Sequence, residues 1–476
     1  MSDSSRRQFI KAGLLGAGSV SLALFAWSRY QERRQGRGIA ESMGPVSAVA
    51  DETTGLPLLL LPDGFRYRTI SWAGSELHDG NPVPGAADGM GVVKQDGSLV
   101  TLVRNHELQG SSGPMGDPAN AYDNTPGGTT TLVFDTASEQ LVDSWVSLGG
   151  TLYNCAGGVT PWNTWLSCEE APHSPQLAHL RKPRKQRFWN LDTAQREHGF
   201  VFEVPATGVA RPEPIYAMGQ FYHEAVAIDP ATGIAYMTED NGPNAGFYRY
   251  VPAEPGRLQA GGRLQMMKVD QRPDMSDYLQ MRLEMDVGWV DIPDPTQGFT
   301  RGNRNGDGVV SQGLAAGGSR FIALEGCTYA EGRVYFTSKL GGRATSGYVL
   351  EYDPLREKIW MVYESQGHDH FSGPDNIVVS PRGGLVICED RLSMNKEAQT
   401  VAGLTPEGEF FRFCQVNPWL RGEYGRYDLA DTVRNSEWAG ATFSEDGEWL
   451  FLNIYNPGVT VAITGPWQDG YIYIRR

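Results

Sequence analysis

The chain has 476 residues, and its 58 glycines, 29 prolines and 11% aromatic residues favour many short strands joined by turns over long helices. The formal net charge of -15 at pH 7 argues against nucleic acid as a partner, because phosphate backbones are bound by basic surfaces. The length would fit two or three average domains, but a propeller of about six blades also uses roughly 350 to 450 residues as one unit.

The first predicted element is a signal or anchor at residues 1–30. The string SRRQFIK, which contains Arg6 and Arg7, precedes an apolar run from Ala12 to Trp27. An arginine pair before a short apolar run resembles a twin-arginine export signal. We therefore expect the twin-arginine export machinery to deliver the protein to the periplasm or the extracellular space. No small-residue cleavage site follows the run directly, so retention at the inner membrane by an N-terminal anchor stays open.

Residues 31–50 carry several arginines and are predicted to form a flexible charged linker. Residues 51–476 are predicted to form a single β-propeller domain. The reason is a strand–turn–strand pattern that recurs six times, at 89–107, 156–170, 224–240, 325–339, 375–390 and 437–454. The copies begin at irregular intervals, which excludes a tight solenoid and fits blades with loop insertions. The expected fold is therefore all-β, a propeller of six blades.

Carboxylates stand at the outer ends of these copies. In a hairpin the first residue of the outgoing strand lies beside the last residue of the returning strand, and a propeller brings its inner strand ends together on one axis. The residues expected to meet there are Asp88, Glu107, Glu169, Glu170, Glu224, Glu239, Asp240, Glu325, Asp375, Glu389 and Asp390. A single acidic strand end is usually only solvated, so the prediction depends on the recurrence.

Such a cluster requires cations. Two like charges about 4 Å apart repel by roughly 4 kcal/mol at an effective dielectric near 20, so several ionised carboxylates do not share a pocket without cations. Hard oxygen ligands in this number indicate calcium, or iron or manganese together with calcium. The chain has five cysteines and no CxxC pair. Of these, Cys168 stands beside Glu169 and Glu170, where a thiolate would select iron.

Five strings carry a family resemblance: RNHE (104–107), TPWNTWLSCEE (160–170), HEAVAIDPATGIAYMTED (223–240), FIALEG (321–326) and GPDNIVVSPRGGLVICED (373–390). Together with the export signal they resemble the PhoX-type alkaline phosphatase family, in the same order along most of the chain. The TPWxTWLxCEE pattern is highly specific, whereas NHE alone is weak. The resemblance implies a secreted six-bladed propeller whose axis holds iron and calcium and which hydrolyses phosphate monoesters.

The resemblance also implies roles for individual residues. Glu325 and Cys168 are placed in the catalytic centre, with Cys168 as an iron ligand. The implied metal ligands are Cys168, Glu170, Glu224, Asp240, Glu325, Asp375, Glu389 and Asp390. The residues implied to orient these ligands without binding a metal themselves are Asn105, His106, Glu107 and His223.

One departure from the family concerns an arginine. The family has Arg-Pro-Glu-Gly where this chain has ALEG at 323–326, and that arginine holds the substrate phosphate. Ala323 cannot form the bidentate fork that an arginine makes on phosphate oxygens. Arg320 lies three residues earlier, roughly 10 Å away along a strand, which is too far to replace it. The sequence therefore predicts a divergent member with slow or absent monoester hydrolysis.

The predicted function is that of an exported metal-dependent hydrolase acting on phosphate esters. One alternative keeps the fold and the metals but changes the small-molecule substrate to another ester or a lactone. A second alternative is a non-catalytic periplasmic propeller that binds calcium alone. Iron together with calcium would favour the phosphatase, whereas calcium alone would favour the binding protein or a lactonase.

Overall fold

The computed structural model describes residues 45–181, 193–277, 279–367, 371–391, 398–406, 408–467 and 472. The predicted signal with Arg6 and Arg7, and most of the predicted linker, lie outside these residues. Strands make up most of the regular secondary structure of the described chain, which contains one α-helix, α2 (Gly308–Ala315). None of its helices is both long and apolar enough to cross a membrane.

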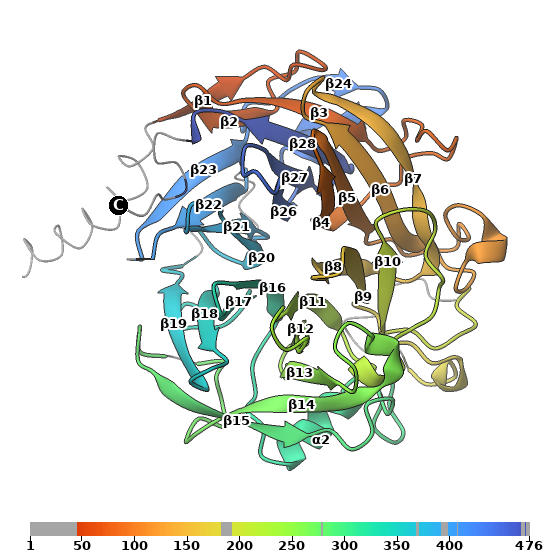
Figure 1. The fold of residues 1–476 in the computed structure, drawn as a ribbon, viewed down its shortest axis with the longest axis vertical. Helices are drawn as coiled ribbons and strands as arrows, with labels where there is room; N and C mark the ends of the chain where they lie inside the picture. Colours follow the sequence, from red (N-terminus) through yellow and green to blue (C-terminus); the bar gives the residue numbers. More distant parts are fainter. Residues whose placement is uncertain are drawn as a thin grey trace, which may run out of the picture.

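The strands form antiparallel groups around a central axis (Figure 1). The first strand of each group lies nearest the axis and neighbours the first strand of the next group. These innermost strands are β4 (Ala87–Asp96), β8 (Asn154–Val159), β11 (His223–Ile228), β16 (Leu324–Ala330), β20 (Pro374–Val379) and β26 (Trp438–Phe443). The predicted all-β propeller class is confirmed.

Each innermost strand pairs through a turn with a second strand, as the repeated pattern predicts. The second strands are β5 (Leu99–His106), β9 (Thr164–Glu169), β12 (Ala235–Glu239), β17 (Arg333–Ser338), β21 (Leu385–Glu389) and β27 (Leu450–Ile454). β12 and β21 are buried along their whole length, because neighbouring groups cover both of their faces. This explains why the copies read as continuous apolar runs rather than as alternating ones.

The outer strands complete the groups. They are β6 (Gly127–Asp135), β7 (Gln140–Thr151), β10 (Val201–Pro205), β13 (Phe247–Pro252), β14 (Gly262–Val269), β15 (Met285–Asp291), β18 (Tyr348–Asp353), β19 (Lys358–Glu364), β22 (Thr400–Leu404), β23 (Phe410–Val416) and β28 (Val459–Thr464). A short hairpin of β24 (Glu423–Tyr424) and β25 (Tyr427–Asp428) lies in the loop before β26. The groups are not six separate sheets, because β15 pairs with both β14 and β19 and joins two of them.

The N-terminal strands attach to C-terminal groups. β3 (Arg66–Trp72) pairs with β28, so the first and last parts of the propeller share one sheet. β2 (Leu59–Pro62) pairs with β23, and β1 (Val46–Val49) pairs with β2. β1 falls within the predicted linker at 31–50, so strand pairing already begins at Val46 rather than at residue 51.

Apolar side chains fill the spaces between neighbouring groups. Phe247 on β13 stacks on Phe336 on β17, with ring centroids 4.0 Å apart and ring planes 17° from parallel. Phe413 on β23 stacks in the same way on Trp467, at 5.5 Å. Close packing of this kind fixes one group against the next, so the inner strand ends that face the axis are held in place.

Every innermost strand contains a bulge near its beginning. Between two paired positions, the innermost strand advances three residues while the second strand advances two, as between Ala87 and Met90 opposite His106 and Arg104. The same step occurs in the other five hairpins. A β-bulge bends the strand and re-aims the side chain at the extra residue. The six bulges therefore turn equivalent side chains at equivalent places around the axis.

Candidate metal centre

Two sets of side chains meet at one end of the axis. The first residue of each bulge forms what we call the bulge set: Asp88, Cys155, Glu224, Glu325 and Asp375, with Gly440 at the sixth position. The residue that follows each second strand forms the strand-end set: Glu107, Glu170, Asp240, Lys339, Asp390 and Tyr455. All of the strand-end set and four of the bulge set line a cavity of about 300 Å³, and Glu224 lies beside it.

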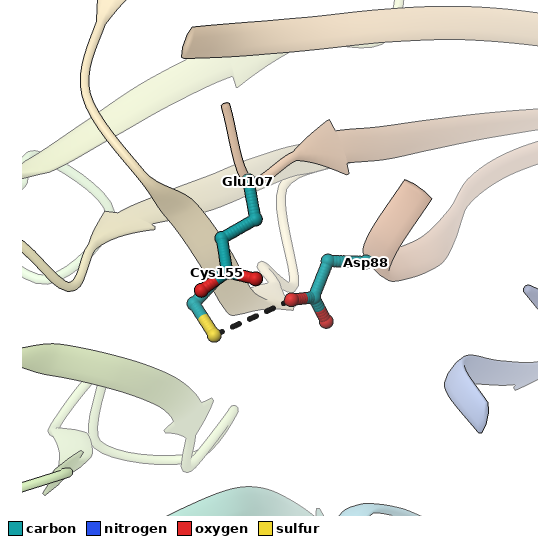
Figure 2. Close-up of side chains that lie close together, drawn as sticks. All are labelled: Asp88, Glu107 and Cys155. Atoms are coloured by element: carbon teal, nitrogen blue, oxygen red, sulfur yellow. Dashed lines mark hydrogen bonds between the residues drawn. The ribbon is translucent and has the colours of Figure 1, made fainter. Parts of the chain in front are cut away.

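Figure 2 shows one edge of this cavity, where Asp88 on β4, Cys155 on β8 and Glu107 after β5 point toward one another. The Cys155 thiol lies 3.4 Å from Asp88 Oδ2 and donates a hydrogen bond to it. The sixth group contributes differently because its bulge residue is Gly440, with φ +64° and space too small for a side chain: an added Cβ would lie 2.7 Å from the Asp88 carbonyl. Glu437, just before β26, supplies the carboxylate there instead.

Strand alternation separates the paired acidic residues of the sequence. Glu169, Glu239 and Glu389 each end a second strand and point away from the cavity, whereas the residue after each of them belongs to the strand-end set. Glu169 accepts hydrogen bonds from the backbone N–H groups of Leu152 and Gly199, both at 2.8 Å. These three glutamates fasten loops rather than face the axis.

Glu389 is the one predicted metal ligand among these three glutamates, and the structure does not bring it to the cavity. Its carboxylate accepts the backbone N–H groups of Ser372 at 3.0 Å and Thr400 at 2.9 Å, and it pairs with Arg391 at 2.7 Å. These three groups engage both carboxylate oxygens of Glu389. Its neighbour Asp390 lines the cavity in its place.

Cys168, the predicted iron ligand and catalytic residue, also lies away from the cavity. It is fully buried in an apolar cluster with Leu166, Val201 and Met237, and burial raises the pKa of its thiol well above the usual value. The thiol that does reach the cavity is Cys155, one strand earlier. Alternation alone does not account for the difference, because Cys168 lies two residues before the inward-facing Glu170 and residues two apart share a face of a strand. The difference is that Cys168 lies within the regular strand β9, whereas Cys155 lies on the bulge of β8, which turns its side chain to the cavity.

The bulge backbones are held by side chains from the neighbouring group. Asn105 on β5 donates to the carbonyl of Cys155 at 3.1 Å, and Asn453 on β27 donates to the carbonyl of Asp88 at 2.5 Å. Thr337 on β17 donates to the carbonyl of Asp375 at 2.8 Å. Asn105, which the sequence predicts to support the metal ligands, thus lies against the bulge that carries Cys155. Each of these bonds links one group to the bulge of the next and fixes the direction of the bulge side chain.

The other predicted supporting residues are placed differently. Glu107 lines the cavity itself and lies with Asp88 and Cys155 in one compact group. His106 hydrogen bonds to the Gly85 carbonyl at 2.8 Å and to Thr130 at 2.9 Å, and His223 bonds to the Gly219 carbonyl at 2.9 Å. Burial lowers the pKa of both histidines, that of His223 to about 3, so both are neutral braces of the backbone.

The cavity is strongly acidic. Eight carboxylates line it, and among the described lining residues Lys339 is the one basic side chain. Burial, followed by the charge of the other carboxylates, raises the pKa of Asp88, Glu107 and Glu224 well above the usual values. Both oxygens of Glu224, which is 1% exposed, have no hydrogen-bond partner among the described residues.

Three overlapping groups of side chains have the spacing of metal ligands. They are Asp88, Glu107 and Cys155; Cys155, Glu170 and Glu224; and Glu224, Glu325 and Asp375, and within each group the ligand atoms lie within 4.8 Å of one another. Buried carboxylates without donors are stable when cations bind them. The unpartnered oxygens of Glu224 and the oxygen and sulfur ligands around it therefore fit a metal centre. The sequence missed Cys155, Lys339 and Glu437, although Cys155 immediately precedes the second copy just as Asp88 precedes the first.

Neither Ala323 nor Arg320 supplies a guanidinium group to the cavity. Ala323 is buried, with φ +41°, and its carbonyl accepts the backbone N–H of Lys339 at 2.9 Å. Arg320 forms an ion pair with Asp274 and donates to Ser276 at 2.9 Å. Its guanidinium is therefore directed at those two residues and does not line the cavity.

A buried histidine lies between two carboxylates outside the cavity. His198 is fully buried, with Nδ1 2.7 Å from Glu169 and Nε2 3.1 Å from Asp123. Burial opposes the charged imidazole, but Glu169 and Asp123 together raise the pKa of His198 to about 9. The histidine is therefore positively charged at neutral pH and joins the end of β9, at Glu169, to the loop that contains Asp123.

The raised pKa of His198 predicts that the stability of the protein depends on pH. The folded pKa of about 9 exceeds the unfolded value, so the contribution of His198 is complete below about pH 6.5 and is lost as the pH rises to 9. We expect the free energy of unfolding to fall by up to about 3 kcal/mol over this range. Urea unfolding at pH 6.5 and pH 9 measures the fall. His198→Gln should be less stable at pH 6.5 and should lose less on going to pH 9; an equal loss in both proteins would contradict the prediction.

Comparison with known proteins identifies relatives of this chain. The model of the family described as alkaline phosphatase PhoX matches residues 43–133 and 127–458. Among solved structures, Pseudomonas fluorescens PhoX in complex with vanadate, a transition state analogue, is similar with a TM-score of 0.62 and 17% identity, covering 92% of this chain and 100% of that one. A gluconolactonase from Xanthomonas campestris, XC5397, gives a TM-score of 0.39 at 10% identity, covering 90% and 97%. None of the curated proteins matches the chain.

Proposed function

Because the chain belongs to the alkaline phosphatase PhoX family, we propose that it is an exported metal-dependent hydrolase of phosphate esters whose centre is the cavity between the bulge set and the strand-end set. The family match supports a phosphatase-like hydrolase. The location rests on Glu224, a buried carboxylate whose two oxygens have no donor within the described part of the chain. Glu224 also belongs to two of the three ligand groups. No other carboxylate of the described chain belongs to two of these groups.

The donor set supports iron together with calcium. Cys155 offers a soft sulfur ligand, which favours iron, and the carboxylates around it offer the hard oxygens that calcium prefers. Glu224, Glu170, Asp88 and Glu107 would share these ions with Cys155. Bound cations would supply Lewis acids that polarise the phosphoryl oxygens of a substrate.

The chain's own residues hold this centre rigidly. Asn105 and Thr337 fix the bulge carbonyls of Cys155 and Asp375, so the ligand directions are set before anything binds. Tyr455 donates a hydrogen bond to Glu107 and keeps that carboxylate pointed into the cavity. Ala323 provides no fork for phosphate, so we expect hydrolysis to depend on the metals and to be slow for monoesters.

The experiment that tests this function combines metal analysis with an assay. Protein exported by its own signal is analysed for iron and calcium and is then assayed with p-nitrophenyl phosphate, a phosphate diester and a lactone. Hydrolysis of a phosphate ester by metal-containing protein is expected. Calcium without iron and without hydrolysis of any of the three would contradict the proposal and favour a binding protein.

Export is proposed from the arginine pair alone. Arg6 and Arg7 precede an apolar run in the order that the twin-arginine machinery recognises. Replacing both with lysine should keep the protein in the cytoplasm, whereas the unchanged protein should reach the periplasm or stay attached to the inner membrane. Cell fractionation with an antibody distinguishes these outcomes, and equal export of both proteins would remove the proposal.

The two cysteines near the site give a matched test of the iron ligand. Cys155→Ser should lose iron and any thiolate-to-iron absorption, because a hydroxyl is a much weaker ligand than a thiolate. Cys168→Ser should keep both and only become less stable, by about 1–3 kcal/mol, since it buries a hydroxyl among apolar side chains. Iron content by mass spectrometry and the visible spectrum measure the difference. Equal iron in Cys155→Ser and the unchanged protein would assign the thiol a structural role.

A further inference from the structure

Lys339 breaks the charge pattern of the strand-end set. Four of its six positions carry a carboxylate, and Lys339 stands at the position after β17 where the neighbouring groups have Asp240 and Asp390. Its place is fixed by the hairpin, because its backbone N–H donates to the Ala323 carbonyl at 2.9 Å. The same repeat geometry that elsewhere directs a carboxylate into the cavity here directs an ammonium group into it.

The ammonium group is surrounded by carboxylates from two groups of strands. Lys339 Nζ lies 3.2 Å from Glu325, on its own hairpin, and 3.3 Å and 2.6 Å from Asp375 and Asp390 on the next one. The side chain is only 15% exposed. Three carboxylates from different strands around one buried positive centre is the arrangement that a protein also uses to bind a hard metal ion.

The three carboxylates around Lys339 stabilise its positive charge, and we call this part of the cavity the Lys339 corner. Burial disfavours the ammonium, but Asp390, Glu325 and Asp375 raise the pKa of Lys339 well above its usual value. Lys339 and a hydrogen bond from Glu437 bring the pKa of Asp390 below its usual value despite burial, whereas burial keeps the pKa values of Glu325 and Asp375 raised. The chain itself thus supplies one positive charge among these three carboxylates, whereas at Glu224 no donor from the described residues reaches the carboxylate.

We propose that the Lys339 ammonium group is a built-in cation that occupies the site formed by Glu325, Asp375 and Asp390 and keeps a metal ion out of it. The inference rests on the proposed function for the metals in the rest of the cavity. Metal binding is thereby confined to the part around Asp88, Glu107, Cys155, Glu170 and Glu224, which holds the two ligand groups that contain Cys155. In the third group, Glu325 and Asp375 pair with Lys339 instead of a metal ion. A divalent cation at the Lys339 corner would have to displace the ammonium group, and the two positive charges would repel each other at such short range.

The test is the number of calcium ions that the protein binds. Lys339→Met keeps the length of the side chain and removes its charge, so it should bind about one more calcium ion per chain than the unchanged protein. Lys339→Arg keeps the charge and should gain none. Lys358→Met is the matched control, because Lys358 forms a similar ion pair, 2.6 Å from Asp286, on an outer strand. Equilibrium dialysis against calcium, followed by elemental analysis, gives the counts.

The calcium counts test both this inference and the proposed function. Equal, non-zero counts in Lys339→Met and the unchanged protein overturn the inference and leave the metal centre standing. Calcium bound by Lys339→Met alone supports the inference and removes the metal centre of the unchanged protein. No calcium in either overturns both. If Lys339→Met does not fold even with calcium present, Lys339→Met combined with Glu437→Gln lowers the repulsion without removing any ion-pair partner of Lys339, and the same gain is expected.

A second measurement does not depend on counting ions. Lys339→Met leaves three carboxylates without their cation, so calcium should raise its melting temperature more than that of the unchanged protein. Lys339→Arg and Lys358→Met should respond to calcium as the unchanged protein does. An equal response of all four proteins would overturn the inference.

Discussion

Replacing Glu224 with glutamine is expected to lower phosphate-ester hydrolysis by about 100-fold or more and to lower the metal content in parallel. Glutamine keeps the shape of the side chain but removes the charge from the residue that belongs to two ligand groups. Loss of one charged group that stabilises a transition state through electrostatics typically reduces a rate by about 10² to 10³-fold. The measurements are the iron and calcium contents and the rate with the phosphate ester, p-nitrophenyl phosphate or a diester, that the unchanged protein hydrolyses faster.

The matched control is Glu239→Gln, fifteen positions further along the same hairpin. Glu239 accepts hydrogen bonds from the Gly246 backbone at 2.8 Å and from Tyr248 at 2.6 Å and does not line the cavity. Its replacement should lower the melting temperature and leave the metal content unchanged. If Glu224→Gln retained its metals and its rate while Glu239→Gln did not, the centre would have to lie elsewhere.

Removing the metals is expected to lower the melting temperature by at least about 5 °C. An ion at a thousand times its Kd contributes about 4 kcal/mol of stability, and a chain of this size shifts by roughly 1 °C per kcal/mol, so two ions suffice. Without cations, Asp88, Glu107 and Glu224 either repel one another or must hold protons at neutral pH. Thermal melts of metal-loaded protein before and after treatment with a chelator measure the effect.

Two controls make the melting experiment specific. Returning calcium and iron to the chelated protein should restore the original melting temperature, which excludes a direct effect of the chelator. Glu224→Gln should lose less on chelation, since it begins with fewer ions and with one fewer buried charge. A protein that is shown to contain metal and melts at the same temperature after complete removal would contradict the metal centre.

The repeated apolar hairpins were predictable because their cause is local. Each copy has two apolar runs and a turn, and such runs pair wherever they are placed, so β16 and β17 could be located from the string at 325–339. The convergence of strand ends on one axis followed from the number of copies. Glu170, Glu224, Glu325, Asp375 and Asp390 were placed at the cavity by this reasoning, and the structure does bring them together.

What the sequence could not determine is which face of a strand each acidic or sulfur side chain takes. Glu389 and Asp390 are neighbours, and strand alternation alone sends one to a loop and the other to the cavity. Cys155 faces the cavity because an extra residue in β8 turns it there, and a bulge is a property of pairing between two strands, not of either string. Cys168, in the more distinctive string, has no such bulge and packs into the core.

The charge balance of the cavity was likewise decided only by the tertiary structure. The composition gives the net charge of -15, and the copies give a line of carboxylates at strand ends. They do not show that Lys339, at the end of one copy, lies against Asp375 and Asp390 of the next, because that contact crosses from one group of strands to another. Local pattern therefore determined the strands and the class of ligand, whereas packing between groups determined which side chains share the cavity and which of them carries the opposite charge.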